Sequence, residues 1–178
     1  AAWGRASAPR RGLRRAPAER GAVYDTSDRD LNEQSATEQP QGVLVVARVP
    51  EVELNGLRPQ ERSAVLVIDG VQDPGNLGTL MRIADAFSAT MVALLPGTVD
   101  PWNAKVVRAS AGSAFHLRIV QTGVDSLSEW LRAHKFELWG ADMEGADAGR
   151  LTPPQRIALA VGNEGAGLRT NRCRRARA

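Results

Sequence analysis

Cysteine is almost absent from this sequence of 178 residues, in which Cys173 stands alone. A single cysteine excludes an internal disulfide and a cysteine cluster for a metal. The sequence also lacks an apolar run of the ~20 residues that a membrane-spanning helix needs. It lacks the apolar core of a secretory signal as well. These absences favour a reducing, cytoplasmic setting without membrane contact, while the arginine- and alanine-rich start leaves organellar targeting open.

Histidine and aromatic residues are also few. The two histidines, His116 and His134, are not spaced as a metal-binding pair, so no metal site is predicted. We expect His116 at the edge of a strand and His134 near the end of a helix. Trp102, Trp130 and Trp139 fall within predicted elements, and we expect them to pack in the core rather than to stack on bases.

Acidic residues are nearly missing from both ends of the sequence. Residues 1–20 carry six arginines against one glutamate, and residues 169–178 carry five arginines and no acid, although the whole chain has a net charge of only +3. Basic ends of this kind can bind RNA by neutralising phosphates. The alternative is that they are disordered ends without a ligand, since neither shows apolar periodicity.

The stretch with the most structural signals runs from residue 65 to residue 87. A β-branched and aliphatic run predicts a buried strand over residues 65–69, and Gly and Pro then predict a turn. Apolar residues at helical spacing predict a helix over residues 77–87, with Asn76 as its cap. A helix N-terminus near Arg82 suits an anionic ligand such as a phosphate.

Strand and helix patterns alternate through the rest of the chain. Helices are expected from Asp100 to about residue 111, and from Asp125 or Ser126 to about residue 134, with Ser126 and Glu129 as a capping box. A polar connection is expected over residues 51–63 and an irregular loop over residues 142–155. The remaining strands are expected at residues 39–49, 91–95, 115–120, 136–141 and 156–161. This alternation predicts an α/β fold with a mostly parallel sheet flanked by helices.

Two motifs carry a family resemblance. The run Asp73-Pro-Gly-Asn-Leu-Gly-Thr-Leu-Met-Arg82 resembles the first motif of the SpoU (TrmH-like) RNA 2′-O-ribose methyltransferases, and Ala160-Val-Gly-Asn-Glu-Gly-Ala-Gly-Leu168 resembles their second. Residues 105–115 are similar to the family's central segment. The resemblance implies a SPOUT-class fold with a trefoil knot, S-adenosyl-L-methionine as cofactor, an rRNA or tRNA substrate, and a homodimer.

The resemblance also implies roles for single residues. By this resemblance Arg82 is the catalytic arginine, which holds a phosphate and stabilises the forming alkoxide. Asn76 and Glu164 join it as catalytic residues, with Glu164 positioning the target nucleotide or the loop of the first motif. Structural roles without a ligand also stay open. Arg82 would then be a surface arginine, Asn76 a helix cap and Glu164 a solvated acid, and the glycine-rich loop would be a turn without a ligand. The implied cofactor-binding residues are Ala141, Gly162, Asn163, Glu164, Gly165, Gly167 and Leu168.

The central segment offers two further polar positions, Arg108 and Ser110. They match the family pattern, but a polar helix face explains them equally well.

The predicted organisation has four parts. Residues 1–20 form a disordered tail, residues 21–60 a remnant of an N-terminal substrate-binding region with a short helix or linker, residues 61–168 the methyltransferase domain, and residues 169–178 an arginine-rich tail. The family's third motif, an Ile-Pro-Met-like strand followed by Ser-Leu-Asn, has no counterpart in the printed residues. We therefore expect one wall of the cofactor pocket to be missing, and weak cofactor binding without RNA methylation.

Two other functions remain open from the sequence. One is a non-catalytic RNA-binding or assembly protein that keeps the methyltransferase fold. The other is an unrelated nucleotide-binding α/β domain. Titration with S-adenosylmethionine separates the methyltransferase hypothesis from both of these alternatives.

Overall fold

The computed structural model describes residues 14–16, 23–35, 42–168 and 174–177, and divides the chain into units of residues 1–48 and 49–178. In the first unit, β1 (Arg14–Ala16) pairs antiparallel with β2 (Val23–Asp25). Helix α1 (Asp28–Gln34) follows, so the helix alternative holds for this segment. The predicted disorder of residues 1–20 does not hold at β1, and the rest of that range lies outside the described residues.

The strand expected over residues 39–49 is wrong where it can be examined. Residues 42–49 form no strand, and residues 39–41 lie outside the described part. The valines that suggested the strand are exposed, with Val46 at 91%. A β-prone run becomes a strand only where a neighbouring strand offers its ladder and a packed face, and none of the described strands pairs with this one.

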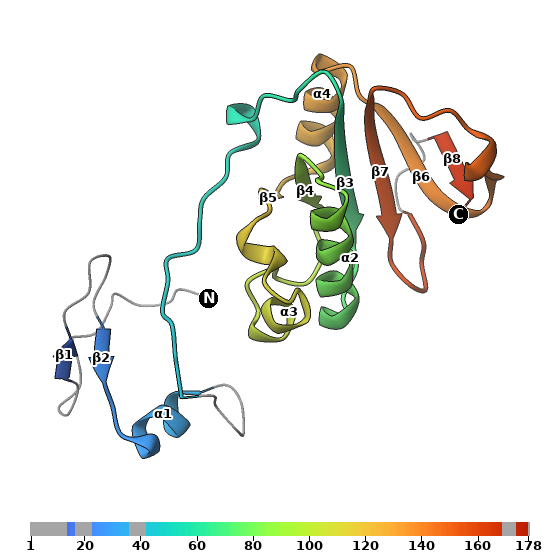
Figure 1. The fold of residues 1–178 in the computed structure, drawn as a ribbon. Helices are drawn as coiled ribbons and strands as arrows, with labels where there is room; N and C mark the ends of the chain where they lie inside the picture. Colours follow the sequence, from blue (N-terminus) through green and yellow to red (C-terminus); the bar gives the residue numbers. More distant parts are fainter. Residues whose placement is uncertain (1–13, 17–22, 36–41, 169–173, 178) are drawn as a thin grey trace. The chain divides into compact units, whose positions relative to one another are not determined.

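The second unit contains a six-stranded sheet in which each neighbouring pair is parallel (Figure 1). The strand order is β5-β4-β3-β7-β6-β8. The predicted parallel α/β fold is therefore confirmed. The strands are β3 (Ser63–Asp69), β4 (Met91–Leu94), β5 (Ile119–Gln121), β6 (Glu137–Asp147), β7 (Arg156–Gly162) and β8 (Arg174–Arg177). Strand β8 lies within the range predicted as a tail, and residues 169–173 and 178 are outside the described part.

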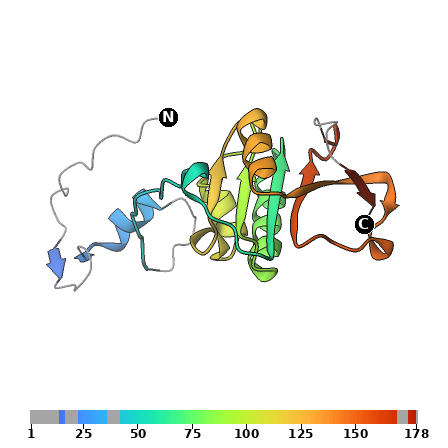
Figure 2. The ribbon, with the colours of Figure 1, turned by 90° about the horizontal axis from the view of Figure 1, so that it is seen from above.

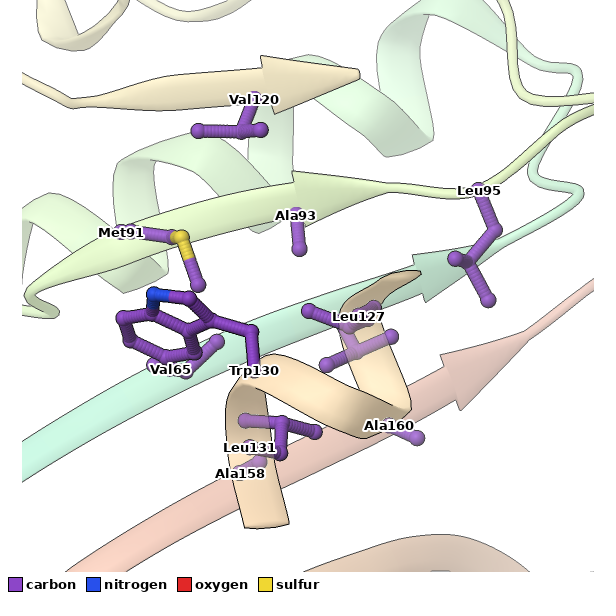
Figure 3. Packing of buried hydrophobic residues seen from close by; sticks show 11 residues of the cluster. Val65, Met91, Ala93, Leu95, Val120, Leu127, Trp130, Leu131, Ala158 and Ala160 are labelled. Carbon is purple, nitrogen blue, oxygen red and sulfur yellow. The ribbon is translucent and has the colours of Figure 1, made fainter. Parts of the chain in front are cut away.

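Alternation along β3 builds two apolar layers. Val65 and Val67 lie in one cluster with Leu127, Trp130 and other residues of α4 (Val124–Ala133). Figure 3 shows Val65 of this cluster beside Trp130. The intervening residues of β3 lie in a second cluster with α2 (Pro74–Ala86) and α3 (Ala104–Ala109). Because side chains of a strand point alternately to opposite faces, helices cover both faces of the sheet at β3, β4 and β5 (Figure 2).

The three predicted packing tryptophans do pack. Trp130 in α4 and Trp139 in β6 are buried, and Trp102 packs against the second cluster. His134 is the C-cap of α4, as expected, and its Nδ1 lies 2.9 Å from the carbonyl oxygen of Trp130. His116 is not at a strand edge, because it follows the short helix η2 (Ser113–Phe115).

Helix starts are the main errors of the sequence prediction. Helix α2 begins at Pro74, capped by Asp73, so Asn76 is not the cap. Helix α3 begins after Asn103, while the carboxylate of Asp100 accepts the N–H of Trp102 in a turn. Helix α4 begins after Gly123 and has no side-chain cap, so the expected capping box does not form. In α2 and α3 a polar residue other than the expected one therefore caps the helix.

Three other boundaries also differ from the prediction. The strand expected over residues 115–120 begins only at Ile119, because Phe115 ends η2 (Ser113–Phe115), so β5 is shorter than expected. Strand β6 continues to Asp147 and is followed by η3 (Ala148–Arg150), where an irregular loop was expected. The connection over residues 51–63 contains the short helix η1 (Leu54–Gly56), and Leu54 packs against the core.

Helices α2 and α3 meet at a glycine. A Cβ built on Gly78 would lie 2.4 Å from the Cβ of Ala109 and 2.7 Å from its carbonyl carbon. We therefore expect Gly78→Ala to lower the free energy of unfolding by about 1–3 kcal/mol through overpacking, despite the better helix propensity of alanine. Gly56→Ala is the matched control, since a Cβ there meets nothing within 4 Å. Equal denaturant midpoints for the two variants would contradict the close contact.

Candidate active site

The order of the strands reverses between β3 and β7. From β3 the chain runs outward through β4 to β5, and it then crosses to β6 and β7 on the other side of β3. Asp69 and Gly162 are register partners, so the carboxyl ends of these two strands lie side by side. In open parallel sheets, the crevice outside the carboxyl ends at such a reversal is the usual ligand site.

The loop after β7 is a tight, internally bonded turn. The N–H of Asn163 donates to the carbonyl of Gly167 at 3.0 Å, and the N–H of Gly167 donates back at 2.9 Å. The side-chain oxygen of Asn163 accepts the N–H groups of Gly165 and Ala166. Gly167 has a φ of +66°, and a Cβ on Gly162 would lie 2.2 Å from the carbonyl carbon of Gly167. The turn therefore requires glycine at these two positions for different reasons.

Two side-chain hydrogen bonds join this turn to the loop after β3. The amide of Asn163 donates to the carbonyl oxygen of Gly70 at 2.9 Å. The amide of Asn76, in the first turn of α2, donates to Glu164 Oε1 at 2.7 Å. The two sequence motifs thus meet at the strand reversal, although Asn76 and Glu164 are 88 residues apart. Both side chains of this second bond are exposed, so they are accessible to a ligand.

Arg82 lies on the same helix but does not join this contact. Its side chain is exposed, and within the described residues no hydrogen bond or ion pair involves it. Arg82 follows Gly78 by one turn, so it lies on the flank of α2 that meets α3. The exposed side chains of Lys105 and Arg108 belong to α3. Positive charge is therefore carried by both of these neighbouring helices.

Ser110 is not part of a polar surface. Its side chain is fully buried, and its hydroxyl donates to the carbonyl oxygen of Val107 at 2.7 Å. The amide of Ala114 donates to the same hydroxyl at 3.4 Å. Ser110 thus fastens the end of α3 to η2. The polar-face interpretation holds for Arg108, which is exposed, and is wrong for Ser110.

Two predicted cofactor residues lie around the turn. Ala141 directly follows the last register pair of β6 with β7, Gly140 with Ala160, so it lies at the same edge of the sheet. Leu168 comes directly after the turn, and its side chain packs against the cluster beneath α4. Gly140 and Ala141 lie within β6 beside the carboxyl end of β7 and its Gly162, so at most a methyl group projects from the backbone at these three positions.

Asp85, in the last turn of α2, has a lowered pKa. A hydrogen bond from the Ser113 hydroxyl is the main cause, and a hydrogen bond and charge from His116 add to it. The His116 Nδ1 lies 3.2 Å from Asp85 Oδ2. Since the folded-state pKa is below the ordinary value, this contact stabilises η2 against α2 above the ordinary pKa. The stabilisation is lost as the pH falls through the lowered pKa.

Comparison with known proteins decides the family. A family model described as the SpoU rRNA Methylase family matches residues 63–178. The chain belongs to this family. As a SpoU family member it is 38% identical over 146 residues to the 23S rRNA (guanosine(2553)-2'-O)-methyltransferase RlmP of Bacillus subtilis (strain 168), an alignment that covers 82% of this chain and 57% of that protein. The chain thus spans a little more than half the length of this curated relative.

Solved structures of the SpoU family share the fold. The AdoMet-bound rRNA methyltransferase from Sinorhizobium meliloti superposes with a TM-score of 0.80 at 29% identity, over 85% of this chain and 60% of that one. The SpoU methyltransferase AviRb from Streptomyces viridochromogenes, in complex with AdoMet, gives 0.66 at 28% identity, over 72% of this chain and 52% of that one. The family match also includes residues 169–178, which the sequence interpretation had set apart as a tail.

Sequence reasoning missed two residues of this SpoU-type site. The carboxylate of Asp73 accepts the main-chain N–H of Asn76 at 2.8 Å and thereby fixes the start of α2. The hydroxyl of Thr98, after β4, accepts the N–H of Gly70 at 3.0 Å. The Asp-Pro pair before the helix was a usable signal for the first. A single threonine in a loop carries no such signal.

Two further observations concern membrane-spanning helices and metal sites among the described residues. None of their helices is long and apolar enough to cross a membrane. No group of three histidine, cysteine, aspartate or glutamate residues among them could hold a metal ion.

Proposed function

We propose that this SpoU family member is an S-adenosyl-L-methionine-dependent RNA 2′-O-ribose methyltransferase that acts on rRNA or tRNA. One observation carries the proposal: the hydrogen bond between Asn76 and Glu164 brings the two family motifs together at the strand reversal. The printed name of the Bacillus subtilis relative supports the reaction and the rRNA substrate. The AdoMet complexes of the two structural relatives support the cofactor.

The residues around the turn fit a nucleoside-sized cofactor. Gly140, Ala141 and Gly162 present backbone and at most a methyl group beside the carboxyl end of β7. The N–H groups of four turn residues are already paired inside the turn. We therefore assign Asn163, Gly165 and Gly167 a part in shaping the pocket. Ala141, Gly162, Glu164 and Leu168 would line it.

The cofactor, when bound, supplies an electrophilic methyl group on sulfur. The chain's own part is to hold the ribose in line with that group, since proximity and orientation give much of the rate. Arg82 is a permanent cation that would bind the adjacent phosphate and stabilise the negative charge that develops on the 2′-oxygen as the hydroxyl loses its proton to solvent. Asn76 and Glu164 would hold the two loops at the spacing that the nucleotide needs. The 2′-hydroxyl is also the group that distinguishes RNA from DNA.

A methyl-transfer assay tests the proposal. The protein is incubated with labelled S-adenosylmethionine and with transcribed rRNA, transcribed tRNA or DNA of the same sequence. We expect label in RNA alone, in nucleotides that resist alkaline cleavage, because a methylated 2′-oxygen cannot attack the neighbouring phosphate. RNA binding without transfer would instead support the assembly-protein alternative, and with it the expectation from the missing third motif that this chain methylates no RNA. Label in a base, released by glycosidic cleavage, would contradict the ribose assignment.

We also propose that the protein works as a cytoplasmic homodimer. Exposed apolar side chains on one face of α2 support association, with Ile83 at 47% and Phe87 at 80% exposure. Light scattering on the purified protein measures the mass directly. A monomer at micromolar concentration would contradict the dimer. Cell fractionation tests the location.

The Asn76 side chain can be tested without disturbing the helix start. The main-chain N–H of Asn76 keeps its partner on Asp73 in Asn76→Ala, so the cap survives while the bond to Glu164 is lost. We expect kcat/KM to fall about 10- to 100-fold, equivalent to about 1.4–2.7 kcal/mol. The kcat/KM of Glu164→Ala should fall by a similar factor. The kcat/KM of the double variant should fall no further, because the two residues act as one unit.

The helix cap provides the control for that experiment. Asp73→Ala removes the cap and leaves the Asn76 amide in place, so we expect a loss of about 1 kcal/mol in stability with a smaller kinetic effect. Kinetic losses for Asn76→Ala and Glu164→Ala that multiply in the double variant would show that the two side chains act independently.

A further inference from the structure

Gly70, the first residue after β3, is held on both of its polar groups by side chains from other loops. Its N–H donates to Thr98 Oγ1 at 3.0 Å, and its carbonyl oxygen accepts from Asn163 Nδ2 at 2.9 Å. Thr98 follows β4 and Asn163 follows β7, the two strands that flank β3 in the sheet. Gly70 is buried and has a φ of +76°, which other residues rarely adopt.

The hydroxyl of Thr98 makes two hydrogen bonds to the end of β3 and the residue after it. The Thr98 hydroxyl donates to the carbonyl oxygen of Ile68 at 3.2 Å while it accepts the N–H of Gly70. Main-chain bonds run beside it, from Leu95 N–H to Ile68 and from Val99 N–H to Val71. A hydroxyl can donate and accept at once, so one side chain satisfies both groups. A methyl group in its place would leave a buried N–H without a partner, which is costly.

The residues directly after Gly70 set up the catalytic constellation. Three residues on, Asp73 caps α2, and in the first turn of α2 the Asn76 amide reaches Glu164. A change in the Gly70 backbone would therefore rotate or shift the loop that carries Asn76. Thr98 itself lies in a loop that neither motif includes.

We propose that Thr98 is a positioning residue for the methyl-transfer site: together with Asn163 it clamps the Gly70 backbone and so fixes the loop that presents Asn76 to Glu164. This inference rests on the proposed function for its kinetic consequence. Asn163 thereby acts mainly as the second side chain that holds Gly70, since its amide donates to Gly70 and accepts the N–H groups of Gly165 and Ala166. Thr98 does not touch the substrate and acts through the loop.

Thr98→Val, Thr98→Ser and Ser63→Ala form the experiment. Valine keeps the shape of threonine without its hydroxyl, and serine restores the hydroxyl. Ser63 is the matched control, because its hydroxyl donates to the carbonyl oxygen of Gln60 at 3.0 Å at the opposite end of the same strand. We expect Thr98→Val to lower kcat about tenfold with the KM for RNA within about twofold. Thr98→Ser should recover kcat to within about twofold, and Ser63→Ala should lose comparable thermal stability with kcat unchanged.

Amide hydrogen exchange makes the clamp testable without activity. In Thr98→Val the Gly70 amide should exchange at least tenfold faster than in wild type, whereas in Ser63→Ala it should not change. If the protein methylates nothing, the proposed function fails and the exchange rates still decide the clamp. Equal exchange at Gly70 in wild type and Thr98→Val, or a kcat in Thr98→Val that matches Ser63→Ala, would overturn the proposal.

Discussion

Arg82→Lys is expected to lower methyl transfer by about 100-fold or more, with S-adenosylmethionine affinity within about twofold. Lysine keeps the charge but loses the planar fork that can contact a phosphate and a neighbouring oxygen together. The structure makes this substitution informative, because Arg82 is exposed and within the described residues has no hydrogen bond or ion pair to lose. A fall in rate therefore reports on the ligand rather than on the fold.

The matched control for Arg82 is Arg132→Lys. Arg132 is exposed in the last turn of α4, which covers the other face of the sheet. We expect single-turnover rates of this variant to equal those of wild type, and thermal midpoints of both variants to stay within about a degree of it. Full turnover by Arg82→Lys would remove the catalytic role that the family resemblance gives to Arg82.

Gly162→Ala is expected to weaken cofactor binding strongly. The added Cβ would lie 2.2 Å from the carbonyl carbon of Gly167 and 2.3 Å from its oxygen, and both are backbone atoms that cannot rotate away. The turn over residues 163–167 would have to open and would lose its two main-chain hydrogen bonds. Since a net hydrogen bond contributes about 1 kcal/mol and about 1.4 kcal/mol is tenfold in affinity, we expect binding to weaken at least 30-fold.

Gly165→Ala separates this steric effect from a general need for glycine. A Cβ at Gly165 would meet Asn163 Oδ1 at 3.6 Å, an ordinary contact distance. Calorimetric titration with S-adenosylmethionine should therefore give nearly wild-type affinity for Gly165→Ala. Equal losses in both variants would mean that the cofactor itself occupies the space beside Gly165. Unchanged binding by Gly162→Ala would show that the turn adopts another form when the ligand binds.

Local patterns were enough to predict the sheet and its class. Residues 65–69, 91–95 and 156–161 are apolar runs too short for helices, and each became a central parallel strand. The reason for β3 and β4 is that a strand buried on both faces needs apolar residues throughout, and few other structures tolerate such a run. The two glycine-containing motifs also stood out, because close backbone approach leaves no freedom in the residue type.

The sequence by itself therefore determined the parallel α/β class, the central strands and the two loops of the candidate site. Only the tertiary structure decided which polar residue caps α2, that residues 42–49 form no strand, and that Ser110 is buried. It also decided that Asn76 meets Glu164 and that Thr98 and Asn163 hold Gly70. These contacts join residues from 28 to 93 positions apart. Such pairs leave no local periodicity, because the strand order that places them together is fixed by packing across the whole sheet.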